Sequence, residues 1–412
     1  MPESPYPMIP IEEAVATVLR EVHPLPPVRV RFADALGLVL ASDVYANEPM
    51  PPFAASAVDG YAVIAEDASA VRQVIGEQPA GRMADLQVTP GTAVRVTTGA
   101  PIPPGADSVI MVEYTVEESS GRVGFSARAA PGGNVRPVGQ DLAAGELVLP
   151  RGTQLGAAEI GMLATVGQIE VPVYPRPRVA VLSTGDELVE PGECLGPGQI
   201  RDSNRFSLLG AVQEAGGQPL DMGRIPDRPE AVGDALERSL SQADAVLTSG
   251  GVSMGQLDFI KPYLASRGTL HFGRVRARPG KPVTFATVEG IPVFAMPGFP
   301  VSALVSFEIY VRPALRKMAG HSHVQRPHRR VALEHPIEHE TGRTEFQRAV
   351  VTRHAGEQYT ARTTGYQGSG RLLSMVGANA LLVLPADQEQ FPSGAEIEAL
   401  IVGPVAEDTP PE

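Results

Sequence analysis

Cysteine is almost absent from this 412-residue sequence, which contains only Cys194. A single cysteine excludes an intramolecular disulfide and a zinc knuckle. Long apolar stretches are missing too, since no run approaches the roughly 18 apolar residues that a membrane-spanning helix needs. Residues 1–10 lack the basic segment and apolar run that mark a secretion signal. We therefore expect a soluble, cytoplasmic protein with no membrane partner.

Positive charge is scarce as well, with 34 lysine and arginine residues against 47 aspartate and glutamate residues. The net charge of −13 argues against a nucleic-acid partner, but it leaves small anions open because these respond to local charge. Hydrophobic residues make up 43% of the chain, enough for several packed cores, and the length favours two to four domains. The 43 glycines and 40 prolines are spread along the chain, which is typical of many tight turns and short strands.

The first 176 residues are expected to be mostly β-structure that follows one short helix. In residues 1–26, apolar side chains recur at helical spacing between positions 11 and 20, and Pro24, Pro26 and Pro27 end the pattern. Short alternating runs follow, broken by glycine and proline, with strands expected at residues 28–32, 93–97, 108–112 and 146–149. We divide this region into β-rich lobe I (residues 27–45 and 144–176) and lobe II (residues 46–143).

Residues 177–326 change to strands that alternate with helices, the pattern of a parallel, doubly wound α/β sheet. Strands are expected at residues 178–182, 218–223, 245–248 and 292–295. Helices are expected at residues 205–215, 229–241, 259–267 and 300–318, with Asp202 or Ser203 as the N-cap of the first. Residues 327–405 return to strands, at 330–335, 345–351, 381–384 and 396–401, and form a final all-β domain. The acidic, proline-rich tail at residues 406–412 is expected to be disordered.

Three loops of the α/β domain carry candidate chemistry, because ligands bind outside the carboxyl ends of the strands in such a sheet. In the first loop, Gly185 allows a tight turn that presents the carboxylates of Asp186 and Glu187. A solvated acidic turn is the plainer alternative. In the third loop, Arg274, Arg276 and Arg278 point to one face if the segment is extended, which makes a local anion site. A solvated edge strand is the alternative there.

The second loop follows the strand at residues 245–248 and is rich in glycine. Gly250 and Gly251, between Ser249 and Ser253, let backbone N–H groups approach an anion closely. Asp258 lies just beyond and is placed to hold a divalent cation beside a phosphate. A flexible connector is the alternative. The rigid turn at residues 296–300 could likewise shape an oxyanion pocket or be a plain turn.

Taken in order along the chain, these segments resemble the molybdopterin molybdenumtransferase family, which includes bacterial MoeA and the E domains of gephyrin and its plant counterpart. No single motif is decisive, but eight motifs in family order span nearly the whole chain. The matching stretches are residues 56–63, 98–112, 133–167, 183–204, 249–258, 278–282, 296–302 and 364–384. The resemblance implies a MogA-like, doubly wound molybdopterin-binding domain, two β-rich N-terminal lobes and a C-terminal β-barrel. It also implies an elongated homodimer whose active site lies between the doubly wound domain of one subunit and an N-terminal lobe of its partner.

The family's functional residues carry over position by position. Its acids fall on Asp59, Asp141, Glu187, Asp227 and Asp258, its hydroxyls on Thr98 and Ser369, and its arginine on Arg348. Arg274 and Arg278 stand where bacterial members have two lysines. A planar guanidinium group therefore replaces a compact ammonium group at each position. Phe299 stands where the family turn often has asparagine, and Ala54 and Ala55 replace an Asp-Asn pair.

The implied activity is insertion of molybdenum from molybdate, or from tungstate of nearly equal size and charge, into adenylylated molybdopterin with release of AMP. The catalytic residues would be Asp59, which orients or activates the oxygen nucleophile, together with Glu187, Asp227 and Asp258, which hold Mg²⁺. The substrate- and anion-binding residues would be Thr98, Asp141, Ser249, Gly250, Gly251, Ser253, Arg274, Arg278, Lys281, Pro297, Pro300, Ser302, Arg348 and Ser369. The resemblance also implies transient contacts with the adenylyltransferase and with cofactor-accepting enzymes.

Two alternatives remain open. Adenylyl transfer from ATP to molybdopterin needs only a domain like residues 178–320, so the extra lobes and barrel count against it. A non-catalytic pterin-binding scaffold is disfavoured because Asp59, Glu187, Asp227 and Asp258 are all present.

Overall fold

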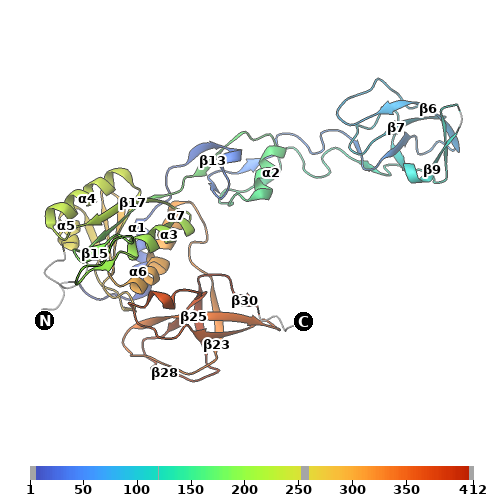
Figure 1. Ribbon diagram of the computed structural model, residues 1–412. Coiled ribbons are helices and arrows are strands. Elements are labelled where there is room, and N and C mark those ends of the chain that lie inside the picture. The colour runs from blue at the N-terminus through green and yellow to red at the C-terminus, as the bar shows by residue number, and fades with distance from the viewer. Residues whose placement is uncertain (1–5, 119, 252–258, 408–412) are drawn as a thin grey trace. The chain divides into compact units, whose positions relative to one another are not determined.

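The computed structural model describes residues 6–118, 120–251 and 259–407 and divides the chain into two compact units (Figure 1). The first unit comprises residues 1–41, 152–156 and 171–412, and the second comprises residues 42–151 and 157–170. Among the residues described, no helix is long and apolar enough to cross a membrane.

The first unit contains a six-stranded sheet that carries the candidate loops. In spatial order its strands are β17 (Gln218–Ile225), β14 (Arg178–Thr184), β18 (Ala245–Ser249), β22 (Ile291–Met296), β21 (Thr284–Val288) and β19 (Thr269–Phe272). The first four strands are parallel, as predicted. β21 pairs antiparallel with both β22 and β19, so the expectation of an entirely parallel sheet was wrong. Glu289 and Gly290, both at positive φ, form a two-residue turn that folds β21 directly against β22.

Helices cover both faces of this sheet, which confirms the doubly wound architecture. They are α3 (Asn204–Glu214), α4 (Pro229–Gln242), α5 (Ile260–Arg267), α6 (Pro300–Ser306) and α7 (Arg312–Met318). Successive residues of β14 point to opposite faces. Val179 and Val181 pack with α3, α6 and α7, whereas Ala180 and Leu182 pack with α4 and α5. Every predicted helix start lies within a residue of the observed one.

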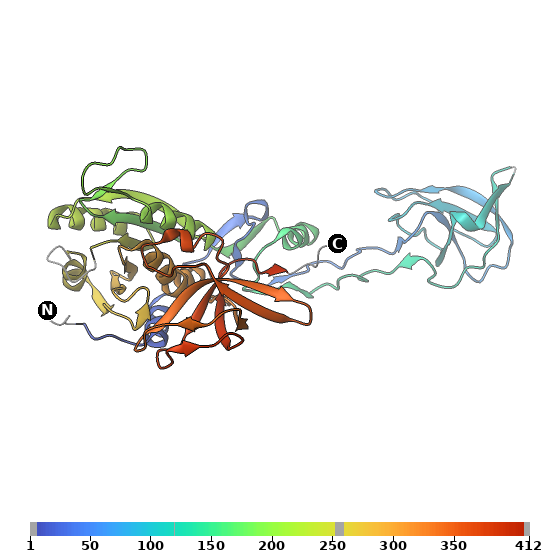
Figure 2. The ribbon, with the colours of Figure 1, turned by 60° about the horizontal axis from the view of Figure 1, so that its bottom comes forward.

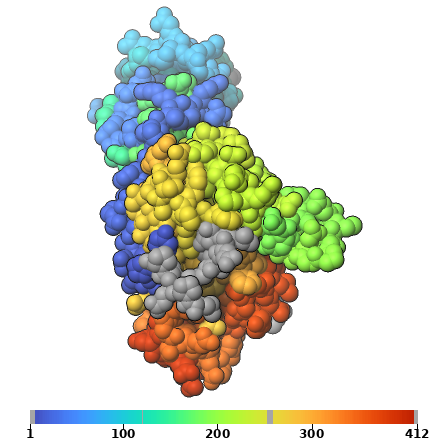
Figure 3. Space-filling view, turned by 90° about the vertical axis from the view of Figure 1, so that its left-hand side faces the viewer, coloured from blue at the N-terminus to red at the C-terminus, as the bar shows by residue number. Residues whose placement is uncertain are grey.

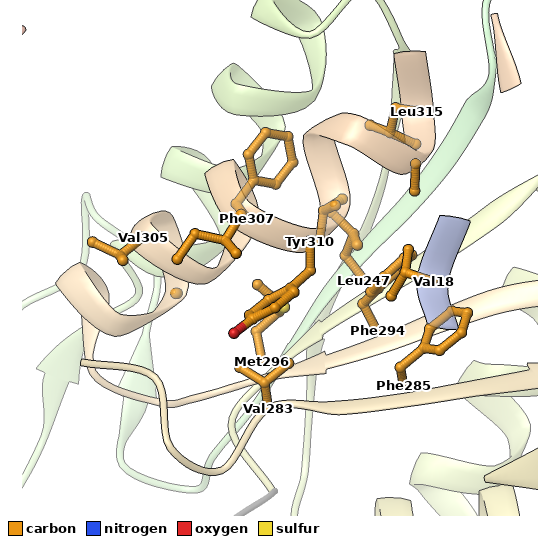
Figure 4. Packing of buried hydrophobic residues seen from close by; sticks show 14 of the residues in the cluster. Val18, Leu247, Val283, Phe285, Phe294, Met296, Val305, Phe307, Tyr310 and Leu315 are labelled. Atoms are coloured by element: carbon orange, nitrogen blue, oxygen red, sulfur yellow. The ribbon is translucent and has the colours of Figure 1, made fainter. Parts of the chain in front are cut away.

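One predicted helix, at residues 300–318, contains an irregularity. A π-helical turn, Phe307–Val311, joins α6 to α7, and the N–H of Arg312 donates to the carbonyl of Phe307 five residues earlier. Pro313 follows and has no N–H, so it cannot donate the backbone hydrogen bond that a regular α-helix would have at this position. The turn is fully packed: Phe307 and Tyr310 lie in the core of the domain with Met296 and Phe294 (Figure 4). The N-terminal helix α1 (Ile11–Glu21) adds Val18 to the same core.

The C-terminal strands close into a β-barrel (Figure 2). β25 (Thr344–His354) pairs with both β26 (Gln358–Thr363) and β27 (Ala380–Leu384), and β23 (His328–Leu333) and β29 (Glu396–Ile401) complete the ring. Two short strands, β24 (Ile337–Glu338) and β28 (Gln390–Phe391), pair separately. The tail was expected to be disordered from residue 406, but β30 (Ala406–Glu407) pairs with the free edge of β25 at Thr352 and Arg353. Another short strand, β20 (Ala277–Arg278), also joins β25 and places Arg278 beside Glu345.

Apart from the short parallel pair β15 (Leu188–Val189) and β16 (Ile200–Arg201), the remaining strands belong to the predicted β-rich N-terminal region. A three-stranded sheet has the order β1 (Val28–Arg31), β13 (Glu170–Tyr174) and β2 (Val39–Leu40). The second unit contains the sheet β8 (Ser108–Met111), β5 (Gly60–Val63), β7 (Thr92–Val96), β6 (Val71–Gln78), β10 (Arg122–Phe125) and β9 (Thr115–Glu118). It also contains the pairs β3 (Val44–Tyr45) with β12 (Leu147–Leu149) and β4 (Ala55–Ser56) with β11 (Val135–Arg136). A helix, α2 (Ala157–Thr165), interrupts this mostly β region at a place where no helix was predicted. The finer division into lobes I and II stays a prediction.

Candidate functional site

The first and second predicted loops and the predicted turn at residues 296–300 start side by side at the carboxyl ends of β14, β18 and β22. Ser183 is in register with Ser249, and Ser249 with Met296, so the segments that follow these residues meet at one edge of the sheet. They surround a cavity of about 790 Å³. The predicted residues that line it are Glu187, Asp227, Ser249, Gly250, Gly251, Pro297, Pro300 and Ser302. Volume and position are those of a small-molecule cleft in an α/β protein.

Glycines are required in the second loop for steric reasons. Gly250 and Gly251 have φ of +92° and +65°, a conformation that L side chains rarely adopt. A Cβ on Gly250 would lie 2.4 Å from the carbonyl oxygen of Thr184, in contact with the first loop. The N–H of Gly250 donates to Met296 O at 3.2 Å, so it is not free for an anion. The predicted residues Ser253 and Asp258 lie outside the described part of the chain.

Asn204, which we did not predict, ties the second loop and the turn at residues 296–300 to the start of α3. Its Nδ2 donates to Ser249 Oγ at 2.7 Å and to Gly298 O at 2.7 Å. The side chain comes from the first turn of α3, and the residue is 9% exposed. Asp202 holds the start of that helix: its carboxylate accepts from the N–H of Arg205 at 3.1 Å and from the hydroxyl of Ser183. Asp202 thus caps the helix, in agreement with one of the two predicted N-caps.

Carboxylates gather where β14 and β17 end. The N–H of Asp227 donates to Asp186 Oδ1 at 3.2 Å, and Glu187 lines the same cavity. Burial raises the pKa of Asp227, and the negative charges of Asp186 and Glu187 raise it further. No group of three or more metal-ligating side chains occurs among the described residues. This donor set is too small for an all-protein Mg²⁺ site, but it fits Mg²⁺ held by one or two carboxylates and the phosphates of a substrate.

A second cavity, of about 810 Å³, adjoins the first and shares Pro282, Ser302 and Gly370 with it. It lies where the doubly wound domain meets the barrel. These two bodies are drawn in green to yellow and in orange to red in Figure 3. Its predicted lining residues are Arg278, Lys281, Ser302 and Ser369. Four charged residues that we did not predict also line it: Glu340, Arg343, Glu345 and Arg371. Four cations against two carboxylates leave two positive charges in excess, which suits a dianion.

Arg278 is the best-connected cation of this second cavity. Its Nη1 donates to Glu340 Oε2 at 2.9 Å, and its Nε lies 3.8 Å from Glu345 Oε2. Lys281 is exposed. The intervening Gly280 has a φ of +104°, and a Cβ there would lie 2.5 Å from Ser306 Oγ. This glycine therefore lets the basic segment lie against α6.

Two predicted anion-binding arginines line neither cavity. Arg348 is fully buried in the barrel, where its Nε donates to Ser374 Oγ at 3.1 Å and its Nη1 to Phe346 O at 3.3 Å. Burial lowers its pKa to about 10. The backbone N–H of Arg348 donates to Gln367 Oε1, and its carbonyl accepts from Gln367 Nε2. Arg348 therefore supports the segment that carries Ser369. Arg274 is half-buried, and its carbonyl accepts the N–H of Ile9 at 3.2 Å.

In the second unit, two predicted residues contact each other directly. The backbone N–H and the hydroxyl of Thr98 donate to Asp59 Oδ1 at 2.6 and 3.0 Å. The pKa of Asp59 is lowered, first by the backbone hydrogen bond and then by the hydroxyl of Thr98, so the carboxylate stays ionised at neutral pH. Asp141 pairs instead with Arg136, and its N–H donates to Met50 O.

Three family models match consecutive parts of the chain. They describe the MoeA N-terminal region (domain I and II) at residues 9–167, a probable molybdopterin binding domain at residues 180–317 and the MoeA C-terminal region (domain IV) at residues 330–402. The first of these agrees with the β-rich N-terminal region and the last with the barrel. Together they account for the whole organisation described above.

Individual relatives agree with the family models. Molybdopterin molybdenumtransferase 2 of Mycobacterium tuberculosis is 38% identical over 94% of this chain and 97% of its own length. Dictyostelium discoideum gephyrin is 35% identical over 98% of this chain, which spans only 63% of that protein. Two solved chains of the Pyrococcus horikoshii MoeA protein superpose with TM-scores of 0.84 and 0.77, at 31% and 32% identity. The superpositions cover 97% and 96% of this chain and 100% of each of theirs. The chain therefore belongs to the MoeA family.

Proposed function

We propose that the protein is a molybdopterin molybdenumtransferase, which inserts molybdenum from molybdate into adenylylated molybdopterin and releases AMP. One observation carries the proposal: a cleft at the carboxyl ends of a doubly wound sheet opens beside a basic pocket with which it shares three residues. The first cavity suits a phosphorylated pterin and the second suits a tetrahedral dianion. A substrate that spans both would bring its sulfurs close to the molybdate.

The glycine loop and the carboxylates are assigned to the pyrophosphate. Gly250 and Gly251 line the cleft, and the absence of a Cβ lets their backbone pack against Thr184 and Ile260. Glu187 and Asp227 would share Mg²⁺ with the phosphate oxygens, and Asp258 joins them through the family resemblance. When bound, the ion would neutralise charge that develops on the phosphoanhydride as it breaks.

Molybdate is assigned to the basic pocket, where Arg278, Lys281, Arg343 and Arg371 supply the positive charge and Ser369 a hydroxyl. A guanidinium can donate two parallel hydrogen bonds to an oxyanion, so arginine suits this role. Tungstate has nearly the same size and charge, and we expect the pocket to accept it as well.

The reaction balances without an external oxidant or reductant. Exchange of two oxo ligands for the two dithiolene sulfurs liberates two equivalents of water and takes up four protons. The two thiols supply two of these protons. Hydrolysis of the phosphoanhydride to two phosphate monoesters consumes one water and supplies the other two. We assign Asp59 to orient this oxygen nucleophile. Its lowered pKa makes it a weak proton acceptor but a permanent hydrogen-bond acceptor, a role in which Thr98 fixes its position. The proposal includes a homodimer in the cytoplasm, since the family resemblance supplies Asp59 from the other subunit.

A product assay separates this proposal from its two alternatives. Purified protein is supplied with adenylylated molybdopterin, Mg²⁺ and molybdate, and the mixture is tested for activation of a molybdenum-free apoenzyme. A transferase yields active cofactor under these conditions. An adenylyltransferase would instead need ATP and molybdopterin and would stop at the adenylylated product. A scaffold would bind the pterin and form neither product.

A further inference from the structure

An exposed aromatic ring lines the first cavity. Phe299 has 62% of its surface exposed, although large apolar side chains in the neighbouring α6 and β22 are buried. It occupies the N-cap position of α6, where its side chain makes no capping hydrogen bond. The ring therefore contributes neither to the core nor to the helix end, and its exposure inside a binding cleft points to a ligand.

The backbone that carries this ring is held on both sides. Gly298 O, just before it, accepts from Asn204 Nδ2 at 2.7 Å, and Phe299 O accepts from the N–H of Ala303 at 3.0 Å. Pro297 and Pro300 restrict the flanking φ angles. The backbone at Phe299 therefore has little conformational freedom to lose when a ligand binds.

The ring is also supported from the barrel side. A Cβ on Gly370 would lie 3.5 and 3.7 Å from Cδ1 and Cε1 of Phe299, so the glycine backbone packs next to the ring. The N–H of Val301 donates to Ser369 O at 3.1 Å and holds the two segments together. Gly370 lines both cavities, and Phe299 therefore lies close to the boundary between them.

The glycine loop, the predicted anion-binding element, lies on the other side. The glycine that precedes Phe299 approaches the glycine loop closely: a Cβ on Gly298 would be 3.9 Å from the Cα of Gly250. A planar ring attached to a phosphate could thus place the phosphate at the loop and the ring on Phe299. Aromatic side chains bind heterocycles in this way because every base has a π-face.

We propose that Phe299 is a stacking platform for a planar heterocycle of the substrate. The inference rests on the proposed function, since adenylylated molybdopterin carries two such rings, adenine and the pterin. It also gives a reason for the aromatic residue at a position where the family often has asparagine. An asparagine contributes hydrogen bonds, whereas Phe299 contributes a flat apolar surface.

The absence of tryptophan from the sequence makes a direct test simple. In the full-length protein, Phe299→Trp places the sole tryptophan at the platform. The variant is titrated with AMP, with 6-hydroxymethylpterin and with ribose 5-phosphate, which lacks a heterocycle. We expect saturable quenching of tryptophan emission by AMP if adenine occupies the platform, by the pterin if the pterin does, and none by ribose 5-phosphate.

A matched control uses Leu373, which is 63% exposed and lines neither cavity. Leu373→Trp should not respond saturably to any of the three compounds, and its signal corrects for light absorbed by the pterin. In an otherwise unchanged protein, Phe299→Leu should weaken binding of the quenching compound by about 5- to 150-fold, and Phe299→Tyr should restore it. Ribose 5-phosphate affinity should be equal in all three proteins.

Two contrary results have different meanings. If equilibrium dialysis shows that wild type binds AMP or the pterin, but Phe299→Leu binds as tightly and the emission of the Phe299→Trp variant does not change, the stacking platform is wrong and the proposed function stands. If wild type binds neither compound, the assignment of the cleft to an adenylylated pterin is itself overturned.

Discussion

At the scale of single residues, carboxylates shape the basic pocket as much as cations do. Glu340 binds Arg278 at 2.9 Å, although its side chain is 77% exposed. Glu345 also faces Arg278, but its side chain is 5% exposed, and His339 Nδ1 lies 3.4 Å from it. The buried glutamate is fixed, whereas the exposed one is free to turn into solvent. Glu340 therefore occupies part of the donor surface that an oxyanion needs.

We predict that Glu340→Gln binds molybdate more tightly than wild type, because the oxyanion no longer competes with a carboxylate for Arg278. An exposed ion pair is worth about 0.2–1 kcal/mol, so the gain should be at most about fivefold. Isothermal titration calorimetry with molybdate measures it. Glu338→Gln, an exposed change of the same charge in the same segment, is the control. Weaker binding by Glu340→Gln would mean that Glu340 positions Arg278 rather than competing for it.

A second residue gives a pH-dependent prediction for the second unit. Asp67 accepts from the N–H groups of Ser69 at 2.9 Å and Gly91 at 2.7 Å and lies 3.4 Å from Arg72. The backbone hydrogen bond from Gly91 is the main cause that lowers its pKa to about 2, from an ordinary value of 3.8. A carboxylate with a lowered pKa stabilises the fold above its unfolded pKa and loses this effect as the pH falls through the folded value.

Asp67→Asn should therefore destabilise the protein at pH 6 and matter less in acid. The difference in unfolding free energy between wild type and variant should fall to roughly half at pH 3 and vanish below pH 2. Urea unfolding followed by far-UV circular dichroism at several pH values provides the comparison. A difference that stays constant with pH would show that ionisation of Asp67 does not contribute to the effect.

Individual site residues differ in how well they could be predicted. Glu187, Ser249 and Lys281 follow strands or belong to local motifs, and each lines a cavity as expected. Asn204 was missed because its role depends on two strands in register, which no local pattern reveals. Arg371 was missed for a similar reason, since it reaches the pocket only when the barrel packs against α6.

At the scale of elements, the glycine loop is the most constrained part of the cleft. Gly250→Ala would place a Cβ 2.4 Å from Thr184 O and force a residue with φ of +92°. We predict that the variant folds but loses most cofactor-forming activity, because the loop must move away from the first loop. Backbone strain of this kind costs about 1–3 kcal/mol.

The matched control is Gly210→Ala, an exposed glycine within α3 whose Cβ would meet nothing within 4 Å. Alanine there should stabilise the helix by about 0.5–1 kcal/mol and leave activity unchanged. Thermal unfolding and the apoenzyme activation assay measure both variants. Full activity in Gly250→Ala would show that the loop tolerates a side chain and is no close-approach site.

Elements were predictable where hydrophobic periodicity was strong. The strand at residues 396–401 and the helix starts of the α/β domain follow the apolar pattern closely. The antiparallel edge was missed because β21 and β22 are separated by only Glu289 and Gly290, and their pairing depends on that turn. α2 was missed because its sequence, rich in alanine, has Leu163 as its single buried residue, so it lacks an apolar stripe.

At the scale of the whole molecule, the barrel and the doubly wound domain share one core. Phe346, Leu381 and Leu400 of the barrel lie in the same cluster as Phe307 and Tyr310. We predict that a chain truncated after residue 326 unfolds at much lower temperature or aggregates, because these contacts are lost. Each buried side chain contributes about 1.5–3 kcal/mol, so the three account for roughly 5 kcal/mol or more. Calorimetry of the truncated and full chains would contradict this if both unfolded at the same temperature.

The order of domains could be predicted, and it also separates the transferase from its nearest alternative. Strand and helix periods change near residues 177 and 327, where the family models also change. An adenylyltransferase would need only the middle part. How the two units are arranged could not be predicted, because no sequence pattern encodes distance.

The most direct test of the central claim is release of AMP from purified adenylylated molybdopterin. We predict release that requires both molybdate and Mg²⁺, with one AMP for each molybdenum inserted. Asp59→Asn should slow it by about two to three orders of magnitude, as loss of one oriented group typically does. Asp85→Asn, an exposed change in the same unit, should not. AMP release without molybdate, or tight pterin binding with no release, would contradict the account.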